Sequence, residues 1–158
     1  HNTKKLLQQY RRVAYAVQMS EDELNLRMEL EHGVHLSSYR LNAELAGVDL
    51  SNTNLESYTR SVVRSKEMLE IIRHTLDNVR LNPEDGEKMY QILYETYFTP
   101  KKPQNRDCIL DALDRAGYPM STTTYHVWLK ESICAFDRIL WGYTARDCIE
   151  IVRSFLPE

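Results

Sequence analysis

Apolar residues recur at intervals of three and four over most of this chain, the spacing of one face of an α-helix. The first such segment covers residues 4–32 and ends before Gly33. Its apolar face comprises Leu6, Tyr10, Val13, Val17, Leu24 and Met28. Ser20 and Glu23 fit a capping box, so a break near Met19 is a second possibility. The less regular residues 35–54 are predicted to form a short helix and a loop.

The most regular pattern lies in residues 55–81, where steps of three and four continue for almost four heptads. An antiparallel pair with residues 4–32 accounts for this seam most simply, because both helices then bury their apolar faces. Self-association or partner binding through the seam is the rival interpretation. The only polar member is Ser65, and the candidate partner residues are Leu55, Tyr58, Val62, Leu69, Ile72, Leu76 and Val79.

The second half of the chain predicts shorter helices. Asn82 to Gly86 ends the long helix, and Pro83 suits the first position of the next, over residues 84–98. A loop (99–105), a short helix (106–116) and a turn follow, and Ser121 is the expected N-cap of a helix that ends at Gly142. A final helix is expected after Thr144. We therefore predict an all-α fold with a long N-terminal helical hairpin (4–81), then a helix-turn-helix bundle with a C-terminal helix (83–158).

The helix after Ser121 has two contrasting sides. A core face comprises Tyr125, Leu129, Ser132, Phe136 and Leu140. The other side begins with hydroxyl, imidazole and ammonium groups, which suit phosphates and base edges. The candidate DNA-binding residues are Ser121, Thr122, Thr123, His126 and Lys130, with Lys101, Lys102 and Arg106 for phosphates. The alternative is that the hydroxyls are ordinary caps and the lysine is simply solvated.

Net charge limits the DNA-binding interpretation. The chain carries a formal charge of −3 with a pI of about 6.0. Residues 83–147 hold eight Lys and Arg against ten Asp and Glu. A domain coated in positive charge is therefore excluded, and DNA contact would need a local patch, a dimer or a neighbouring polymerase.

Signals for catalysis are weaker. The sequence has no Gly-rich phosphate loop and no nucleophile motif, so we expect no enzyme and no cofactor. His32 and His35 lie across a predicted helix end without an identifiable third ligand, which argues against a metal site. Three separated cysteines are typical of free thiols in a reducing cytosol. No apolar run is long enough to span a membrane, and the expected location is cytoplasmic.

The second half of the chain resembles the ArpU/RinA-like family of phage transcriptional regulators, related to the region-four domain of sigma factors. Residues 85–102, ILDAL (109–113) and residues 117–142 carry this resemblance. The corresponding motif residues are Tyr97, Phe98, Ser121 and Tyr125, with Lys130-Glu131-Ser132. The resemblance implies promoter binding and activation of late phage genes through the helix beginning at Ser121.

The expected function is thus a phage-type transcriptional regulator that inserts the helix at Ser121 into the major groove of double-stranded promoter DNA. Possible further partners are RNA polymerase and a second copy in a homodimer. A helical protein-interaction module, or a phage adaptor without DNA contact, is the alternative, and the acidic balance favours it.

Overall fold

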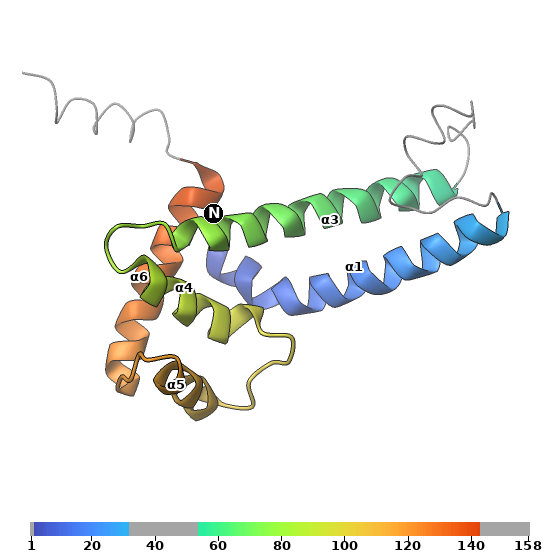
Figure 1. Ribbon diagram of the computed structural model, residues 1–158. Coiled ribbons are helices and arrows are strands. Elements are labelled where there is room, and N and C mark those ends of the chain that lie inside the picture. The colour runs from blue at the N-terminus through green and yellow to red at the C-terminus, as the bar shows by residue number, and fades with distance from the viewer. Residues whose placement is uncertain (1, 32–53, 143–158) are drawn as a thin grey trace, which may run out of the picture. The chain divides into compact units, whose positions relative to one another are not determined.

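The computed structural model describes residues 2–31 and 54–142 of the chain (Figure 1). These residues form α-helices and one π-helix, with turns between them, so the predicted all-α class is confirmed. The elements are α1 (Thr3–Glu31), α3 (Asn54–Val79), α4 (Gly86–Leu93), η1 (Tyr94–Phe98), α5 (Arg106–Arg115) and α6 (Thr122–Trp141). The segment expected at 35–54, apart from its last residue, and the final helix after Thr144 lie outside the described residues.

The chain forms two compact units, and their limits differ from the expected division at 4–81 and 83–158. Over the described residues, unit 1 combines residues 2–11 with residues 71–142, and unit 2 combines residues 12–31 with residues 54–70. Both long helices therefore contribute to each unit. The first turns of α1 belong with the short helices and not with a separate N-terminal pair.

Unit 2 contains an antiparallel pair formed by α1 and α3 (Figure 1). An ion pair of 2.8 Å joins Lys66 Nζ to Glu21 Oε1. The continuous helix predicted at residues 4–32 is confirmed, and the alternative of a break near Met19 is wrong, since α1 runs through this point. Side-chain pairs at i, i+4, namely Gln18–Asp22 and Glu23–Arg27, support the helix across this point. The side chains buried in this unit are Val17, Leu24, Val62 and Leu69, together with Thr59.

Unit 1 has a core to which every one of its described helices contributes. Aromatic contacts connect its parts: the ring centroids of Tyr10 and Phe98 lie 4.5 Å apart, and those of Phe98 and Phe136 lie 6.3 Å apart. At the C-terminal end of α6, Trp141 Nε1 donates to Thr3 Oγ1, and the Thr3 hydroxyl donates to Asp137 Oδ1. The buried apolar residues are Leu7, Tyr10, Ile72, Leu76, Val79, Met89, Ile92, Leu93, Tyr97, Leu113, Tyr125 and Phe136.

The predicted seam of α3 is used inside the chain. Val62 and Leu69 are buried in unit 2, and Ile72, Leu76 and Val79 are buried in unit 1. Self-association through these five residues would require them to be uncovered first. The side chains of Leu55 and Tyr58 lie outside the described residues. On α1, the expectation that Val13 is a core residue is wrong, because it is 40% exposed.

The connection between α3 and α4 corrects a predicted helix start. Residues 83–85 form a turn, so Pro83 is not the first helical residue, and α4 begins at Gly86. Asn82 Oδ1 accepts from the amide of Glu84, and Asp85 has a left-handed backbone with φ of 59°. A Cβ on Gly86 would lie only 2.5 Å from the carbonyl oxygen of Arg80. Glycine is therefore needed where α4 passes the end of α3.

Candidate nucleic-acid interface

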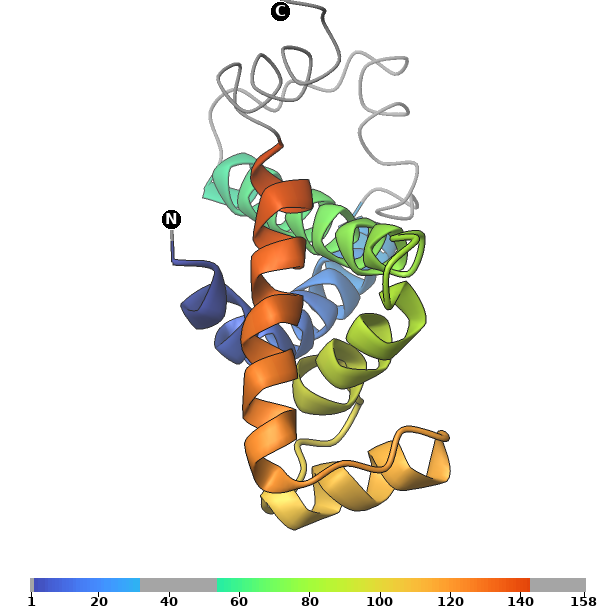
Figure 2. The same cartoon turned by 90° about the vertical axis from the view of Figure 1, so that its left-hand side faces the viewer.

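Helices α4, α5 and α6 share one apolar cluster, which positions the candidate interface. Ile92, Leu113 and Tyr125, one from each helix, form its centre. Figure 2 shows α5 running across the end of α6 where α6 begins. Partly buried side chains complete the cluster: Ile109, Leu110, Met120, Trp128 and Leu129. Leu113 is the buried residue of α5, and Ala116, just beyond the end of that helix, is exposed.

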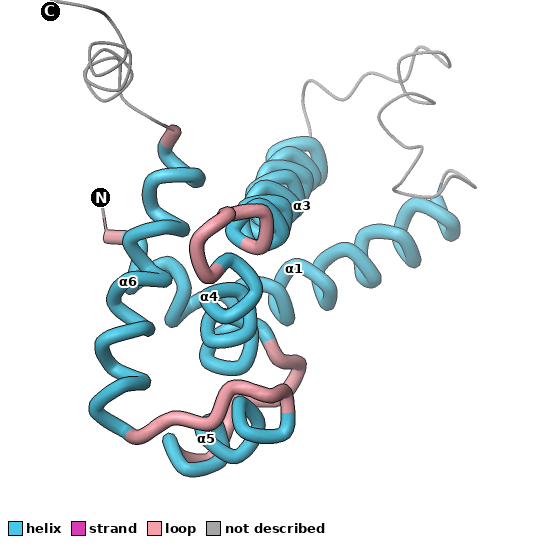
Figure 3. The backbone as a smooth tube through the Cα atoms, turned by 60° about the vertical axis from the view of Figure 1, so that its left-hand side comes forward, coloured by secondary structure: helices cyan, strands magenta, loops and turns pink. Residues whose placement is uncertain are grey.

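The turn between α5 and α6 follows helix-termination rules. Gly117, with φ of 92°, ends α5, and the amide of Tyr118 donates to the carbonyl of Leu113 at 2.8 Å. Residues 116–121 then lead into α6 (Figure 3). Six residues between the helices exceed the three or four typical of a helix-turn-helix. The two predicted helices are present, but this connection does not establish a helix-turn-helix arrangement.

Ser121 is the N-cap of α6, as predicted. Its hydroxyl oxygen accepts from the amide of Thr124 at 3.2 Å, which satisfies one of the free amides at the helix start. The Ser121 hydroxyl also lies 3.1 Å from Thr124 Oγ1. Part of the threonine-rich start is therefore explained by capping. Thr123 is exposed and Thr122 half-buried.

The structure brings two of the candidate residues into direct contact. Arg106 Nη1, at the start of α5, lies 2.8 Å from His126 Nε2 on α6. In this contact the guanidinium donates, so the imidazole nitrogen accepts its hydrogen. Lys130 is exposed one turn further along α6. We use the name reading surface for Ser121, Thr122, Thr123, His126 and Lys130.

Lys101 and Lys102 lie on a different segment, the loop between η1 and α5, and both are exposed. Arg11 holds the start of this loop. Its guanidinium donates to the carbonyl oxygens of Thr99 at 2.8 Å and Thr96 at 3.1 Å, and to Thr99 Oγ1 at 2.8 Å. These bonds satisfy carbonyls at the end of η1, and burial lowers the pKa of Arg11.

Arg11 and η1 are the features of the site that the sequence did not reveal. Residues 84–98 were predicted as one α-helix, but Tyr94–Phe98 form a π-helix. The hydroxyl of Thr96 donates to the carbonyl of Ile92 at 2.6 Å, and the amide of Thr99 donates to that of Tyr94. No periodicity in the sequence marks such a widened turn. Arg11 is 85 positions or more from its acceptors, so no local motif connects them.

Two further cations are partly committed to aromatic rings. Lys88 Nζ lies 3.9 Å from the ring centroid of Trp128, on the side of α6 that packs on α4. Arg80 stacks on Tyr90 at 3.6 Å and pairs with Glu87 at 3.2 Å. The side chains of Lys88 and Arg80 therefore pack against aromatic rings of unit 1. The candidate cations are of a different kind, since Lys101, Lys102, Arg106 and Lys130 are exposed on the loop before α5, on the first residue of α5 and on α6.

The charge balance of unit 1 changes once residues 2–11 are included. This segment adds Lys4, Lys5 and Arg11 without any acid. The described residues of unit 1 hold twelve Lys and Arg against ten Asp and Glu, although the whole chain is acidic. The unit that contains the reading surface is therefore weakly cationic over its described part.

Two buried tyrosines, Tyr97 of η1 and Tyr125 of α6, belong to the core of unit 1. Tyr125 Oη lies 2.8 Å from Thr96 Oγ1, which ties α6 to η1. Burial raises the pKa of Tyr125, against smaller lowering effects of the Thr96 hydrogen bond and the Arg106 charge. Burial, with a contribution from Tyr125, raises the pKa of Tyr97 to about 12. Both phenols are therefore protonated at neutral pH and contribute to packing and hydrogen bonding.

Comparison with protein-family models, with curated proteins and with solved structures finds no match to this chain. The resemblance to ArpU/RinA-like regulators thus depends on the sequence motifs alone. Across residues 2–31 and 54–142, no helix is both long and apolar enough to cross a membrane. The same residues contain no cluster of three His, Cys, Asp or Glu side chains suited to a metal ion. His32, His35 and Cys148 lie outside the described residues.

Proposed function

We propose that this protein is a non-enzymatic, phage-type transcriptional regulator that binds double-stranded promoter DNA in the major groove through the start of α6. The observation that carries the proposal is the Arg106–His126 contact, which gathers a guanidinium and an imidazole beside the exposed, capped beginning of a long helix. The major groove of B-DNA is wide enough to admit an α-helix, and the start of α6 presents hydrogen-bond donors suited to phosphates and bases.

In this mechanism the residues have separate tasks. His126, Thr123 and Lys130 face base edges, because they project from the first turns of α6. Arg106, Lys101 and Lys102 contact phosphates, which set position without reading sequence. The weak positive charge of unit 1 limits affinity, so binding as a dimer or beside RNA polymerase is part of the proposal.

A salt titration of DNA binding tests the proposal. Phage promoter duplexes and duplexes selected from a random library are titrated with the full chain between low and moderate salt. Replacing both Lys101 and Lys102 with Ala should reduce the steepness of the plot of log association constant against log salt concentration by about 2. This is the change expected when two phosphate contacts are lost. Lys130→Ala and His126→Ala should lower affinity for selected duplexes about tenfold each while leaving non-selected DNA less affected.

Arg115→Ala is the matched control, since it removes one exposed cation from the end of α5 and not from the reading surface. It should leave sequence preference unchanged. If wild type, Lys130→Ala and His126→Ala bind every duplex with the same affinity, the proposal that the reading surface contacts DNA is overturned.

A second candidate function, a protein-interaction module, is favoured by the outward side of α1 in unit 2. Large apolar side chains are exposed there at helical spacing: Tyr15, Met19, Leu26 and Leu30. Sedimentation equilibrium tests its self-association form. A concentration-dependent dimer abolished by Leu26→Ser with Leu30→Ser would support it, and a monomer at every concentration would exclude it. Ring-like oligomers would indicate an adaptor.

A further inference from the structure

One residue beside the reading surface does not fit a polar, solvated helix face. Val127 is 58% exposed, although it lies within the second turn of α6 between His126 and Trp128. The other large apolar side chains of α6 are buried or half-buried, except Trp141 at the far end. Trp141 is hydrogen-bonded to Thr3, so its place is accounted for within unit 1.

Val127 lies on the same side of α6 as the proposed base contacts. Its angular neighbours at i−4 and i+3 are Thr123 and Lys130, because residues three and four apart share a helix face. Both are exposed. A branched apolar group in the middle of this face would enter any groove into which Thr123 and Lys130 are inserted.

Only one apolar group occurs on base edges in the major groove, the 5-methyl group of thymine. We infer that Val127 contacts a thymine methyl, and that the preferred duplex therefore contains thymine at one defined position facing the second turn of α6. This inference rests on the proposed function, and it adds a residue that determines specificity by apolar contact.

A double-mutant cycle between protein and DNA tests the inference with the full chain. Each thymine of a selected duplex is replaced in turn by deoxyuridine, which removes the methyl group and keeps the base pair. For the wild type, one position should lose affinity about three- to fivefold, the effect of losing one buried methyl contact. Val127→Ala should lose a similar factor on the thymine duplex and should show no further loss with deoxyuridine.

Cys134→Ala provides the matched control, since Cys134 is exposed on the same side two turns further along α6. It should retain the full sensitivity to deoxyuridine. If no duplex is enriched from the library, the proposed function fails. If a duplex is enriched and bound but Val127→Ala responds to deoxyuridine as the wild type does, only the Val127 inference is overturned.

Discussion

At the scale of single residues, burial in unit 1 raises the pKa of two phenols, those of Tyr97 and Tyr125. Tyr97 is only 6% exposed, and burial raises its pKa to about 12 from the ordinary value of 10. In the unfolded chain the same phenol loses its proton near pH 10. The folded state therefore binds more protons between these two values, and stability falls as pH rises through this range.

We expect the free energy of unfolding to be unaffected by Tyr97 below about pH 9 and to fall by about 2 kcal/mol between pH 10 and pH 12. Tyr97→Phe removes this component, because a phenyl ring does not titrate. Denaturant unfolding followed by circular dichroism at several pH values measures the difference between the two proteins. A constant difference from pH 8 to pH 12 would contradict the expectation.

At the scale of secondary structure, the features that depend on residues close in sequence could be predicted. Helical spacing located α1, α3, α5 and α6, and the Ser121 cap was correct to the residue. The start of α4 was missed because the turn at Asp85 depends on a left-handed backbone that Asp rarely adopts. The π-helix was missed because no periodicity in the sequence marks a widened turn. The Arg11 contacts were missed because their acceptors are distant in sequence.

Ser121 should show separable structural and binding effects. Ser121→Ala loses the bond to the Thr124 amide and should lower stability by about 1 kcal/mol. Ser121→Asp keeps an N-cap acceptor and suits the helix dipole, so stability should be retained while phosphate repulsion weakens DNA binding. Thermal unfolding and a DNA titration measure the two effects. Equal DNA affinity of Ser121→Asp and wild type would remove Ser121 from the interface.

At the scale of the whole molecule, each long helix contributes to two compact units. Sequence periodicity could not show this, because the apolar stripe of α1 continues from one unit into the other. Leu7 and Leu24 are both fully buried in α1, at 1% and 0% exposure, yet they belong to different units. The same substitution at these positions should therefore act on different parts of the chain.

We expect Leu7→Ala and Leu24→Ala each to cost about 2–5 kcal/mol of local stability. Hydrogen exchange followed by mass spectrometry should show faster exchange in α4 and α6 for Leu7→Ala, and in residues 59–70 of α3 for Leu24→Ala. Gln8→Ala, an exposed neighbour of Leu7, should change neither pattern. Identical exchange patterns for the two leucine variants would show that the units unfold together.

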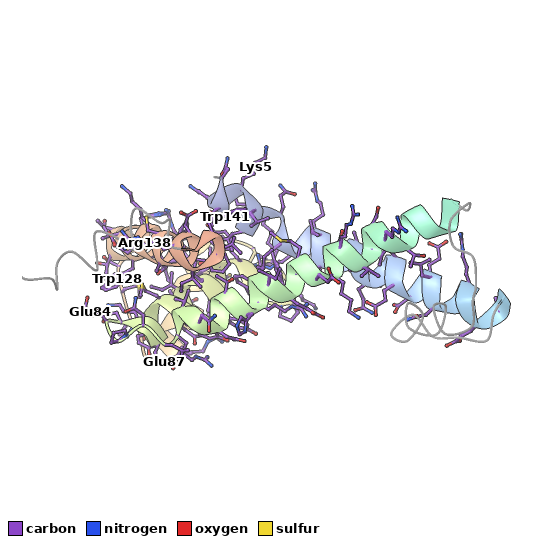
Figure 4. The ribbon with its side chains drawn as sticks, turned by 90° about the horizontal axis from the view of Figure 1, so that it is seen from above. Lys5, Glu84, Glu87, Trp128, Arg138 and Trp141 are labelled. Atoms are coloured by element: carbon purple, nitrogen blue, oxygen red, sulfur yellow. The ribbon has the colours of Figure 1, made fainter. Side chains whose placement is uncertain are left out.

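The composition of α6 has a practical consequence. The chain has two tryptophans, and both Trp128 and Trp141 lie on this helix (Figure 4). Trp128 lies beneath the Lys88 ammonium and next to Val127, and Trp141 is bonded to the start of α1. Intrinsic fluorescence that is excited selectively in the tryptophan absorption band therefore reports on α6 alone. The helix proposed to enter DNA is its own optical probe, so groove insertion can be followed in the unlabelled protein.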